Sequence, residues 1–264
     1  MDPLVIAEQI AYYQARATEY EDWFFRRGRF DQGKVQNAQW FAEVSNLKRQ
    51  LRKRGPIGDI LELACGTGIW TRELVSLGQS ITAIDASSNV LAINRSRLSH
   101  SSVKFVQKDL FSWEPDREFD MVFCSFWISH IVPESLPLFL DKVARATRPG
   151  GEVFMIDSRY DETVTLNDHP KTHPEKTLQT RELNDGSCFR IVKVFYEKEA
   201  LLKLFSSAGL QARVHYTSRY FFGWWRHEGL EKVSRINRFQ VDARTVFHYF
   251  SNAPLRIQTT RSSD

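Results

Sequence analysis

The sequence predicts an α/β fold in which a mostly parallel seven-stranded sheet carries helices on both faces. Short apolar runs alternate with helix-type segments through the middle of the chain, as expected for parallel strands joined by crossover helices. The first run, Ile60–Leu63, leads directly into the turn Ala64-Cys65-Gly66-Thr67-Gly68. Polar residues follow the next runs as well, at the edge where open α/β sheets bind ligands.

Seven apolar runs supply the expected strands. They cover 60–63, 80–84, 103–107, 119–125, 152–156, 210–216 and 220–225. The clearest helix lies between the fourth and fifth runs, where Leu136, Phe139, Leu140 and Val143 recur at helical spacing. Pro149-Gly150-Gly151 ends that segment and turns the chain into the fifth strand.

The chain divides into three predicted parts. Residues 1–55 form a helical lid that ends at Gly55-Pro56, and residues 56–225 form the core. The core carries an inserted cap around 158–196, in which polar residues 161–180 predict a loop and Asn184-Asp185-Gly186-Ser187 predicts a hairpin turn. Residues 226–264 form a carboxyl-terminal extension with a helix expected around 228–246.

The glycine turn favours a nucleoside ligand smaller than a dinucleotide. A dinucleotide fingerprint needs a third glycine, and Thr71 takes its place. Asp85 ends the second strand, where a carboxylate can accept hydrogen bonds from both ribose hydroxyls. The alternative is that Asp85 caps the next helix, a role that Ser87 or Ser88 could also fill.

With these features the chain resembles the class I S-adenosylmethionine-dependent methyltransferases of the small-molecule branch. The matching segments are LELACGTG at 61–68, AIDAS at 83–87, QKDLF at 107–111, FDMVFCSF at 119–126 and RPGG at 148–151. They cover roughly residues 56–160. The segments at 12–31 and 181–196 are similar to the lid and inserted hairpin of these enzymes, whereas the chain after Trp225 departs from the pattern. The resemblance implies a Rossmann-like fold.

The resemblance also implies S-adenosylmethionine (SAM) as cofactor and S-adenosylhomocysteine (SAH) as product. The turn backbone would approach the amino-acid end of the cofactor, Asp85 the ribose and Asp109 the adenine. The residues expected to bind it are Glu62, Ala64, Gly66, Gly68, Asp85, Ala86, Asp109, Leu110, Ser125, Tyr20 and Arg29. Glu62 would orient the turn, Tyr20 would close the lid and Arg29 would pair with the cofactor carboxylate. The alternative for Tyr20 is that it belongs to an amphipathic helix that docks on the core. The alternative for Arg29 is that it is a solvated surface arginine.

His130 is the candidate catalytic residue. It follows the strand that ends at Ser125, in a loop facing the expected methyl group, and histidine titrates near neutral pH. Methyl transfer from a sulfonium mainly requires positioning, and a base is needed only when the acceptor carries a proton. The alternative is a histidine that merely hydrogen-bonds its own loop.

Composition limits the remaining partners. The net charge is +4 and the basic residues crowd 48–54, although Trp40, Val44 and Leu47 make the same segment a helix with an apolar stripe. We therefore expect no nucleic-acid partner. The three cysteines form no metal-ligand pair and His169 and His173 lack a clear carboxylate partner, so no metal is expected. Without a signal peptide or a membrane-spanning run, we expect a cytoplasmic monomer or homodimer.

Three functions remain open. The first, implied by the resemblance, is methyl transfer to O, N or C of a small aromatic or apolar metabolite. Aromatic residues make up 13% of the chain, which fits a pocket for such a substrate, although packing in the core is the first explanation for them. An RNA- or protein-modifying methyltransferase is the second. The third is a methyltransferase-fold protein with a non-methylating role, as a cyclase or a structural subunit.

Overall fold

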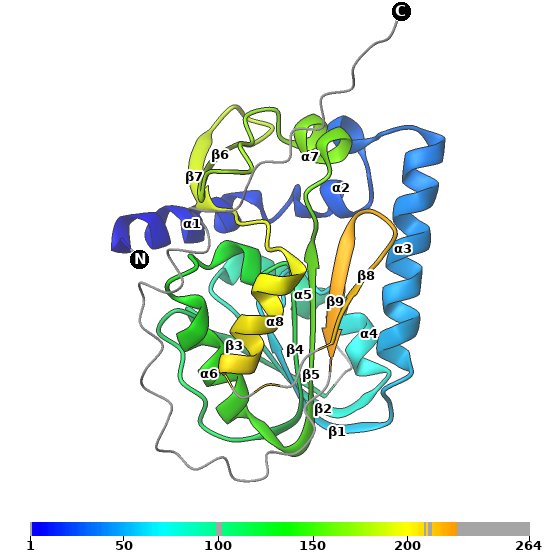
Figure 1. Ribbon diagram of the computed structural model, residues 1–264, viewed down its shortest axis with the longest axis vertical. Helices are drawn as coiled ribbons and strands as arrows, with labels where there is room; N and C mark the ends of the chain where they lie inside the picture. The colour runs from blue at the N-terminus through cyan, green and yellow to red at the C-terminus, as the bar shows by residue number, and fades with distance from the viewer. Residues whose placement is uncertain (1, 99–101, 209, 211–212, 226–264) are drawn as a thin grey trace, which may run out of the picture.

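The computed structural model describes residues 2–98, 102–208, 210 and 213–225. The predicted extension 226–264 and its helix around 228–246 lie outside the described residues. Within them, a central sheet carries helices on both sides (Figure 1). The α/β fold that the sequence predicts is therefore confirmed.

The sheet has seven strands in the order β3-β2-β1-β4-β5-β9-β8. Strands β3, β2, β1, β4 and β5 pair in parallel, whereas β9 is antiparallel to both β5 and β8. The strands are β1 (Ile57–Leu63), β2 (Gly78–Asp85), β3 (Val103–Gln107), β4 (Phe119–Ser125), β5 (Thr147–Ser158), β8 (Arg213–Tyr216) and β9 (Phe221–Trp225). The order reverses between β1 and β4, so their carboxyl ends flank the crevice where such sheets bind ligands.

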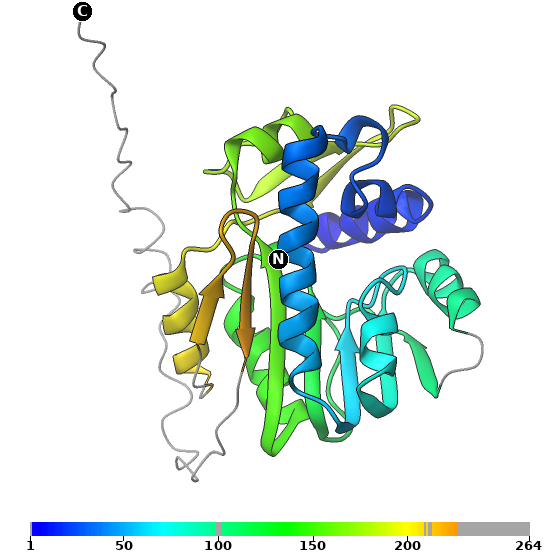
Figure 2. The same cartoon turned by 90° about the vertical axis from the view of Figure 1, so that its right-hand side faces the viewer.

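Two apolar layers cover the faces of the sheet, because successive strand residues point to opposite sides. In β4, Val122 and Cys124 join the core under one set of helices, and Met121 and Phe123 join the core under the other. The first core packs against α6 (Leu136–Ala146) and α8 (Lys198–Ser207). The second packs against α3 (Lys34–Arg52), α4 (Thr71–Val75) and α5 (Ser88–Arg97). Figure 2 shows α3 running along the sheet.

The lid and the cap cover one end of the sheet (Figures 1 and 2). The lid elements are α1 (Pro3–Arg16), α2 (Tyr20–Phe24) and the 3₁₀ helix η1 (Gly28–Phe30), and the cap elements are α7 (Glu162–Asp168), β6 (Leu178–Glu182) and β7 (Cys188–Val192). Tyr12 of α1 packs on Leu183 and Ile191 of the hairpin in a small apolar cluster. Gln9 fastens α1 further, because its side chain donates to the His130 carbonyl oxygen and accepts from Val192 N. A second 3₁₀ helix, η2 (Ile128–His130), follows β4 beneath them.

The prediction of a loop over 161–180 is wrong. Residues 162–168 form α7, and residues 178–182 form β6, the first strand of the hairpin. Asp161 caps α7 by accepting from Val164 N at 3.1 Å. The helix buries only Val164 and Asp168, so it leaves no apolar repeat for a sequence pattern to detect.

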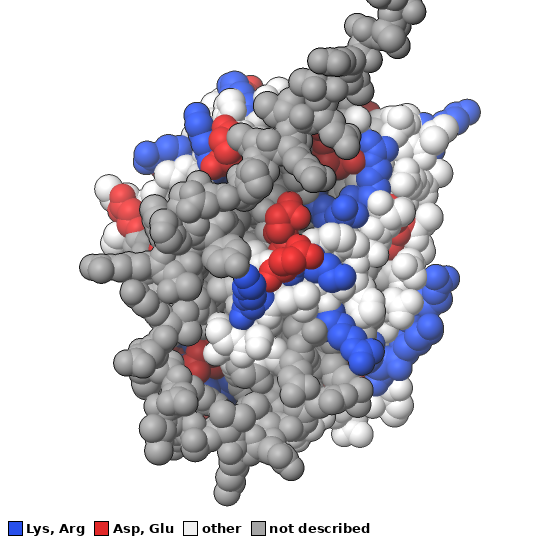
Figure 3. Space-filling model, viewed as in Figure 1, with Lys and Arg blue, Asp and Glu red and all other residues white. Residues whose placement is uncertain are grey.

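The basic segment 48–54 belongs to the surface of α3 and its end. Lys48 and Arg52 pair with Glu73 at 3.0 and 2.5 Å, and Arg54 lies 3.7 Å from Glu152. On the face shown in Figure 3, basic and acidic side chains also lie side by side near the centre. This pairing matches the expected solvated helix face. Among the described residues, no helix combines the length and apolarity needed to cross a bilayer.

Candidate active site

The turn after β1 holds its backbone in conformations that side chains disfavour. Ala64, Gly66 and Gly68 all have positive φ values, of 54°, 54° and 93°. At Gly68 a Cβ would lie 2.3 Å from Asn94 Oδ1, so glycine is required by space as well as by conformation. Asn94 in turn donates to Gly66 O and Thr71 Oγ1. Thr71, in place of the third glycine, therefore helps to fix the turn.

Asp85 connects this turn to the start of α5. Its Oδ2 accepts from Gly66 N and its Oδ1 accepts from Ser87 N, both at 2.9 Å. Burial raises the pKa of the carboxyl, and the backbone donors oppose that rise. Ser87 is the N-cap of α5, since its hydroxyl accepts from Val90 N. The helix α5 is therefore capped by Ser87 and not by Asp85.

A cavity with about 690 Å³ of empty volume opens at this turn; we name it the glycine-turn cavity. It is a concave site at the carboxyl ends of the parallel strands, where ligands bind to sheets of this kind. The predicted residues that line it are Ala64, Gly66, Asp85, Ala86, Asp109, Leu110, Ser125 and Tyr20. The structure thus brings together residues from the ends of β1, β2 and β4, the loop after β3 and the lid.

Glu62 lies beneath the turn and is 1% exposed. Burial raises the pKa of its carboxyl to about 8, against a hydrogen bond from Thr71. Its Oε2 atom has no hydrogen-bond partner within the described part of the chain. A buried carboxyl oxygen without a partner suits a ligand or water that supplies one, so Glu62 fits its predicted place below the amino-acid end of a cofactor.

Two other predicted residues have local partners. Asp109 accepts from Phe111 N at 2.9 Å, so its carboxylate both shapes the loop after β3 and lines the glycine-turn cavity. Arg29 does not line that cavity. Its guanidinium donates to Glu182 O at 2.9 Å and stacks on Phe30. The arginine therefore connects the lid to the hairpin, and this placement gives no support to the prediction that Arg29 holds the cofactor carboxylate.

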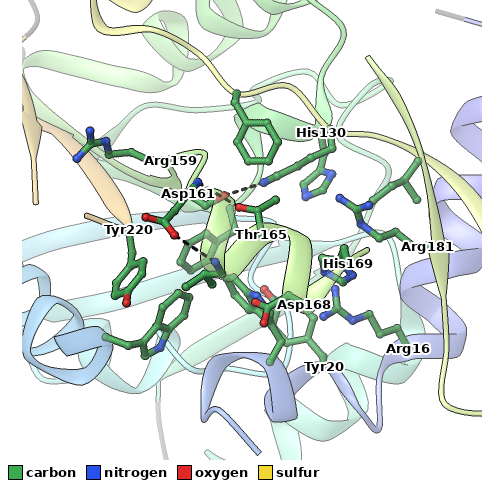
Figure 4. Close-up of a pocket in the computed structure, with 18 of the residues that line it drawn as sticks. Arg16, Tyr20, His130, Arg159, Asp161, Thr165, Asp168, His169, Arg181 and Tyr220 are labelled. Carbon is green, nitrogen blue, oxygen red and sulfur yellow. Dashed lines mark hydrogen bonds between the residues drawn. The ribbon is translucent and has the colours of Figure 1, made fainter. Parts of the chain in front are cut away.

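A second cavity, with about 710 Å³ of empty volume, lies between the lid and the cap; we name it the cationic cavity. Figure 4 shows Arg16, Arg181, His130 and His169 together at one end of it. Its charged, imidazole and aromatic lining consists of Arg16, Arg159, Arg181, Lys193, Asp161, Asp168, His130, His169, Tyr13, Tyr20, Trp23, Trp40, Phe126, Phe195 and Tyr220. Asp168 is paired with Arg26, and Asp161 with Arg219.

The two cavities adjoin. Tyr13, Tyr20 and Phe126 line both, so these three residues lie at the boundary between them. Phe126 follows β4 directly and has a positive φ of 53°, an uncommon conformation for an aromatic residue. With this backbone conformation, Phe126 lies at the boundary between the two cavities.

His130 is held at the same boundary from both ring nitrogens. Its Nδ1 lies 2.6 Å from Val192 O and its Nε2 lies 2.8 Å from Tyr13 Oη. A carbonyl only accepts, so Nδ1 carries the proton and Nε2 accepts from the Tyr13 hydroxyl. Burial, followed by the charge of Lys193, lowers the pKa of His130 well below 6.5. The imidazole is therefore neutral at physiological pH.

Sequence reasoning missed the cationic residues. Arg16 comes from the lid, Arg181 from β6 and Lys193 from the chain just after β7, so no motif contains all three. One signal was available: strand alternation places Gln179 and Arg181 on the buried face of β6. No group of three or more histidine, cysteine, aspartate or glutamate side chains suited to a metal ion occurs in the part of the chain that the structure describes.

Comparison with known proteins agrees with this geometry. A family model described as a methyltransferase domain matches residues 60–151. Probable thiol methyltransferase 2 of Arabidopsis thaliana is 30% identical over 114 residues, which are 39% of this chain and 50% of that protein. The solved structure of DhpI with SAH is 32% identical, with a TM-score of 0.69 over 85% of this chain and 97% of DhpI. A DhpI complex with SAM and HEP gives the same identity and TM-score.

The positive-φ turn, the partnerless Glu62 oxygen and the carboxylates at the ends of successive strands fit SAM. SAM is the cofactor and SAH its product. With a family match over the core and a relative that is similar over nearly its whole length, the chain belongs to the class I S-adenosylmethionine-dependent methyltransferases.

Proposed function

We propose that this chain transfers the methyl group of SAM to a small molecule held in the cationic cavity. The observation that carries the proposal is the boundary formed by Tyr13, Tyr20 and Phe126, which line both cavities. SAM bound at the glycine turn supplies an activated methyl group on a sulfonium. The chain then has to hold an acceptor in line with it, which is an effect of proximity and orientation.

Different residues of the glycine-turn cavity are assigned to different parts of SAM. We assign the ribose hydroxyls to Asp85, the adenine to Asp109, Leu110 and Ala86, and the amino-acid end to the turn above Glu62. Asp85 retains acceptor capacity, because an ionised carboxylate offers more lone pairs than Gly66 N and Ser87 N occupy. Ser125 and Tyr20 complete the wall beside the boundary.

Enclosure of the cavities supports a small acceptor. The lid, the hairpin and α7 cover the carboxyl end of the sheet (Figure 1), and the cationic cavity lies beneath them. Bulky RNA or a protein surface would have to displace elements that Gln9 and Tyr12 fasten to the core and hairpin. A small molecule reaches the cavity without displacing them.

Transfer of labelled methyl tests this proposal. The full chain is incubated with methyl-labelled SAM and, separately, with small metabolites, RNA and protein from a cell extract. We expect label in the small-molecule fraction and SAH formation that depends on it. Label in RNA or protein instead would assign the second function, and SAH binding without transfer to any fraction would assign a non-methylating role.

We assign His130 the role of a positioning residue that acts through Tyr13. The imidazole accepts from the Tyr13 hydroxyl, which leaves the tyrosine oxygen able to accept a hydrogen bond from the acceptor. We expect His130→Ala to lower turnover at least about tenfold, because leaving the buried Tyr13 hydroxyl without its acceptor costs about 1–3 kcal/mol and about 1.4 kcal/mol is a factor of ten. SAH affinity should remain within about twofold, because His130 does not line the glycine-turn cavity.

Two readouts separate this role from a general structural one. Tyr13→Phe should reproduce the loss of turnover in His130→Ala. The pKa of His130 lies well below 6.5, so the imidazole stays neutral as pH falls from 8 to 6. Turnover should therefore show no loss with a midpoint near 6.5, where an ordinary histidine would gain a proton. Unchanged turnover in His130→Ala would remove the residue from the mechanism.

A further inference from the structure

We infer that the small-molecule acceptor carries an oxyanion, a carboxylate or a phosphate-like group, which Arg16 and Arg181 bind in the cationic cavity. This inference rests on the proposed function, since it names the class of molecule that occupies the acceptor site. It starts from the charges that face the cavity and from their partners.

Arg16 and Arg181 are buried without a counter-ion. They are 6% and 3% exposed, and no carboxylate forms an ion pair with either of them within residues 2–98, 102–208, 210 and 213–225. Arg16 stacks on Tyr12 and Tyr20, and its Nη2 atom is buried without any hydrogen-bond partner in the same ranges. Arg181 donates to Thr172 Oγ1 at 2.9 Å and to Thr180 O at 3.3 Å, both neutral.

The carboxylates that line the cavity have ion-pair partners outside it. Asp168 forms two hydrogen bonds with Arg26, at 2.8 and 3.0 Å, and Asp161 is bound in the same way by Arg219. Neither Arg26 nor Arg219 lines the cavity. The charge of Asp168 also acts on the two cavity arginines, but its oxygens are bound to Arg26, so it gives neither of them an ion pair.

The other polar groups add hydrogen-bonding capacity and little net charge. Lys193 lies 3.6 Å from Asp157, which offsets its charge, and donates to the hydroxyls of Ser129 and Ser158. His130 and His169 are neutral, because burial lowers the pKa of both well below 6.5. They add hydrogen-bonding capacity without adding charge.

A buried charge without a partner is costly, and proteins pair such charges. Two buried guanidinium groups that face one cavity without an ion pair therefore point to an anionic ligand that completes the pairing. Arginine suits this because its planar fork binds carboxylate and phosphate oxygens in pairs. The aromatic rings of the cavity then contact the rest of the acceptor, so a fully apolar acceptor would leave the arginines unpaired.

Thermal unfolding in the presence of saturating SAH tests the inference on the full chain. The probes are inorganic phosphate and acetate, and the neutral control is acetamide. A ligand that binds only the folded state raises the unfolding temperature. We expect phosphate, acetate or both to raise it and acetamide to leave it unchanged. Phosphate alone would assign a tetrahedral oxyanion, and acetate alone a carboxylate.

Arg16→Met and Arg181→Met test the assigned residues. Each should weaken the affinity for the effective probe at least about tenfold, because a hydrogen bond to a charged group contributes about 1.5–3 kcal/mol and about 1.4 kcal/mol is a factor of ten. Arg72→Gln is the control, since Arg72 is exposed and lines neither cavity. It should retain the full response.

SAH titration of the same variants distinguishes the possible failures. Arg16 and Arg181 do not line the glycine-turn cavity, so SAH should raise the unfolding temperature of each variant as it does for the original chain. If SAH binds but neither anion shifts the original chain, the oxyanion inference is overturned and the proposed function stands. Equal anion affinity in all variants would also overturn it. Loss of SAH binding by the original chain would contradict the proposed function itself.

Discussion

Replacing Asp85 by alanine is expected to weaken SAM and SAH binding at least about 100-fold. Asp85 is the carboxylate that we assign to the ribose hydroxyls, and a hydrogen bond to a charged acceptor contributes about 1.5–3 kcal/mol. Loss of two such bonds therefore amounts to about 3 kcal/mol or more, and each 1.4 kcal/mol is about a factor of ten in affinity. Calorimetric titration with SAH measures the effect directly.

The structural cost of Asp85→Ala has to be measured separately. The same carboxylate accepts from Gly66 N and Ser87 N, so its removal also loosens the turn. Asp85→Asn keeps one oxygen acceptor and should bind SAH with intermediate affinity. Asp116→Ala is the matched control, because Asp116 is exposed and lines neither cavity. SAH affinity in Asp85→Ala equal to that of Asp116→Ala would contradict the assigned role.

Gly68→Ala is expected to destabilise the protein by about 3 kcal/mol or more. The φ of 93° at Gly68 is strained for any residue with a Cβ, which costs about 1–3 kcal/mol. The added Cβ would lie 2.3 Å from Asn94 Oδ1 and 2.7 Å from Asn94 Cγ. Asn94 is fully buried, so it has to move, and overpacking of this kind costs about 1–3 kcal/mol more. Denaturant unfolding measures the change.

Gly150→Ala separates the cost of the positive φ from the cost of the contact with Asn94. Gly150 has a similar φ of 80°, but a Cβ there meets nothing within 4 Å, so it should show only the conformational cost. SAH binding should be lost in Gly68→Ala, because a displaced Asn94 no longer holds Gly66 O and Thr71 Oγ1. It should persist in Gly150→Ala. Equal stability of the two variants would show that the contact with Asn94 is unimportant.

The sheet and the glycine turn could be predicted because their signals are local. Strand alternation and the Gly66-Thr67-Gly68 turn are written in consecutive residues, and polar residues after parallel strands necessarily share one edge. β3 and β4 accordingly begin and end at the predicted residues. Asp85 and Asp109 line one cavity for the same reason.

The acceptor side could not be predicted in the same way. Arg16 and Arg181 meet only because α1 packs on the β6–β7 hairpin, and the sequence places them far apart without a shared motif. His130 was found from its place after β4, but its partners Tyr13 and Val192 come from the lid and the hairpin. The contact of Arg29 could not be predicted for the related reason that its partner, Glu182 O, belongs to the hairpin. Tertiary packing decides these contacts.

A crystal structure of the full chain with SAH tests the central claim most directly, because that claim concerns which cavity holds the cofactor. We predict that the ribose of SAH lies against Asp85 and that its sulfur faces the boundary formed by Tyr13, Tyr20 and Phe126. The space between Arg16 and Arg181 should remain available to an acceptor. SAH bound in the cationic cavity, or with its sulfur directed away from that boundary, would contradict the account.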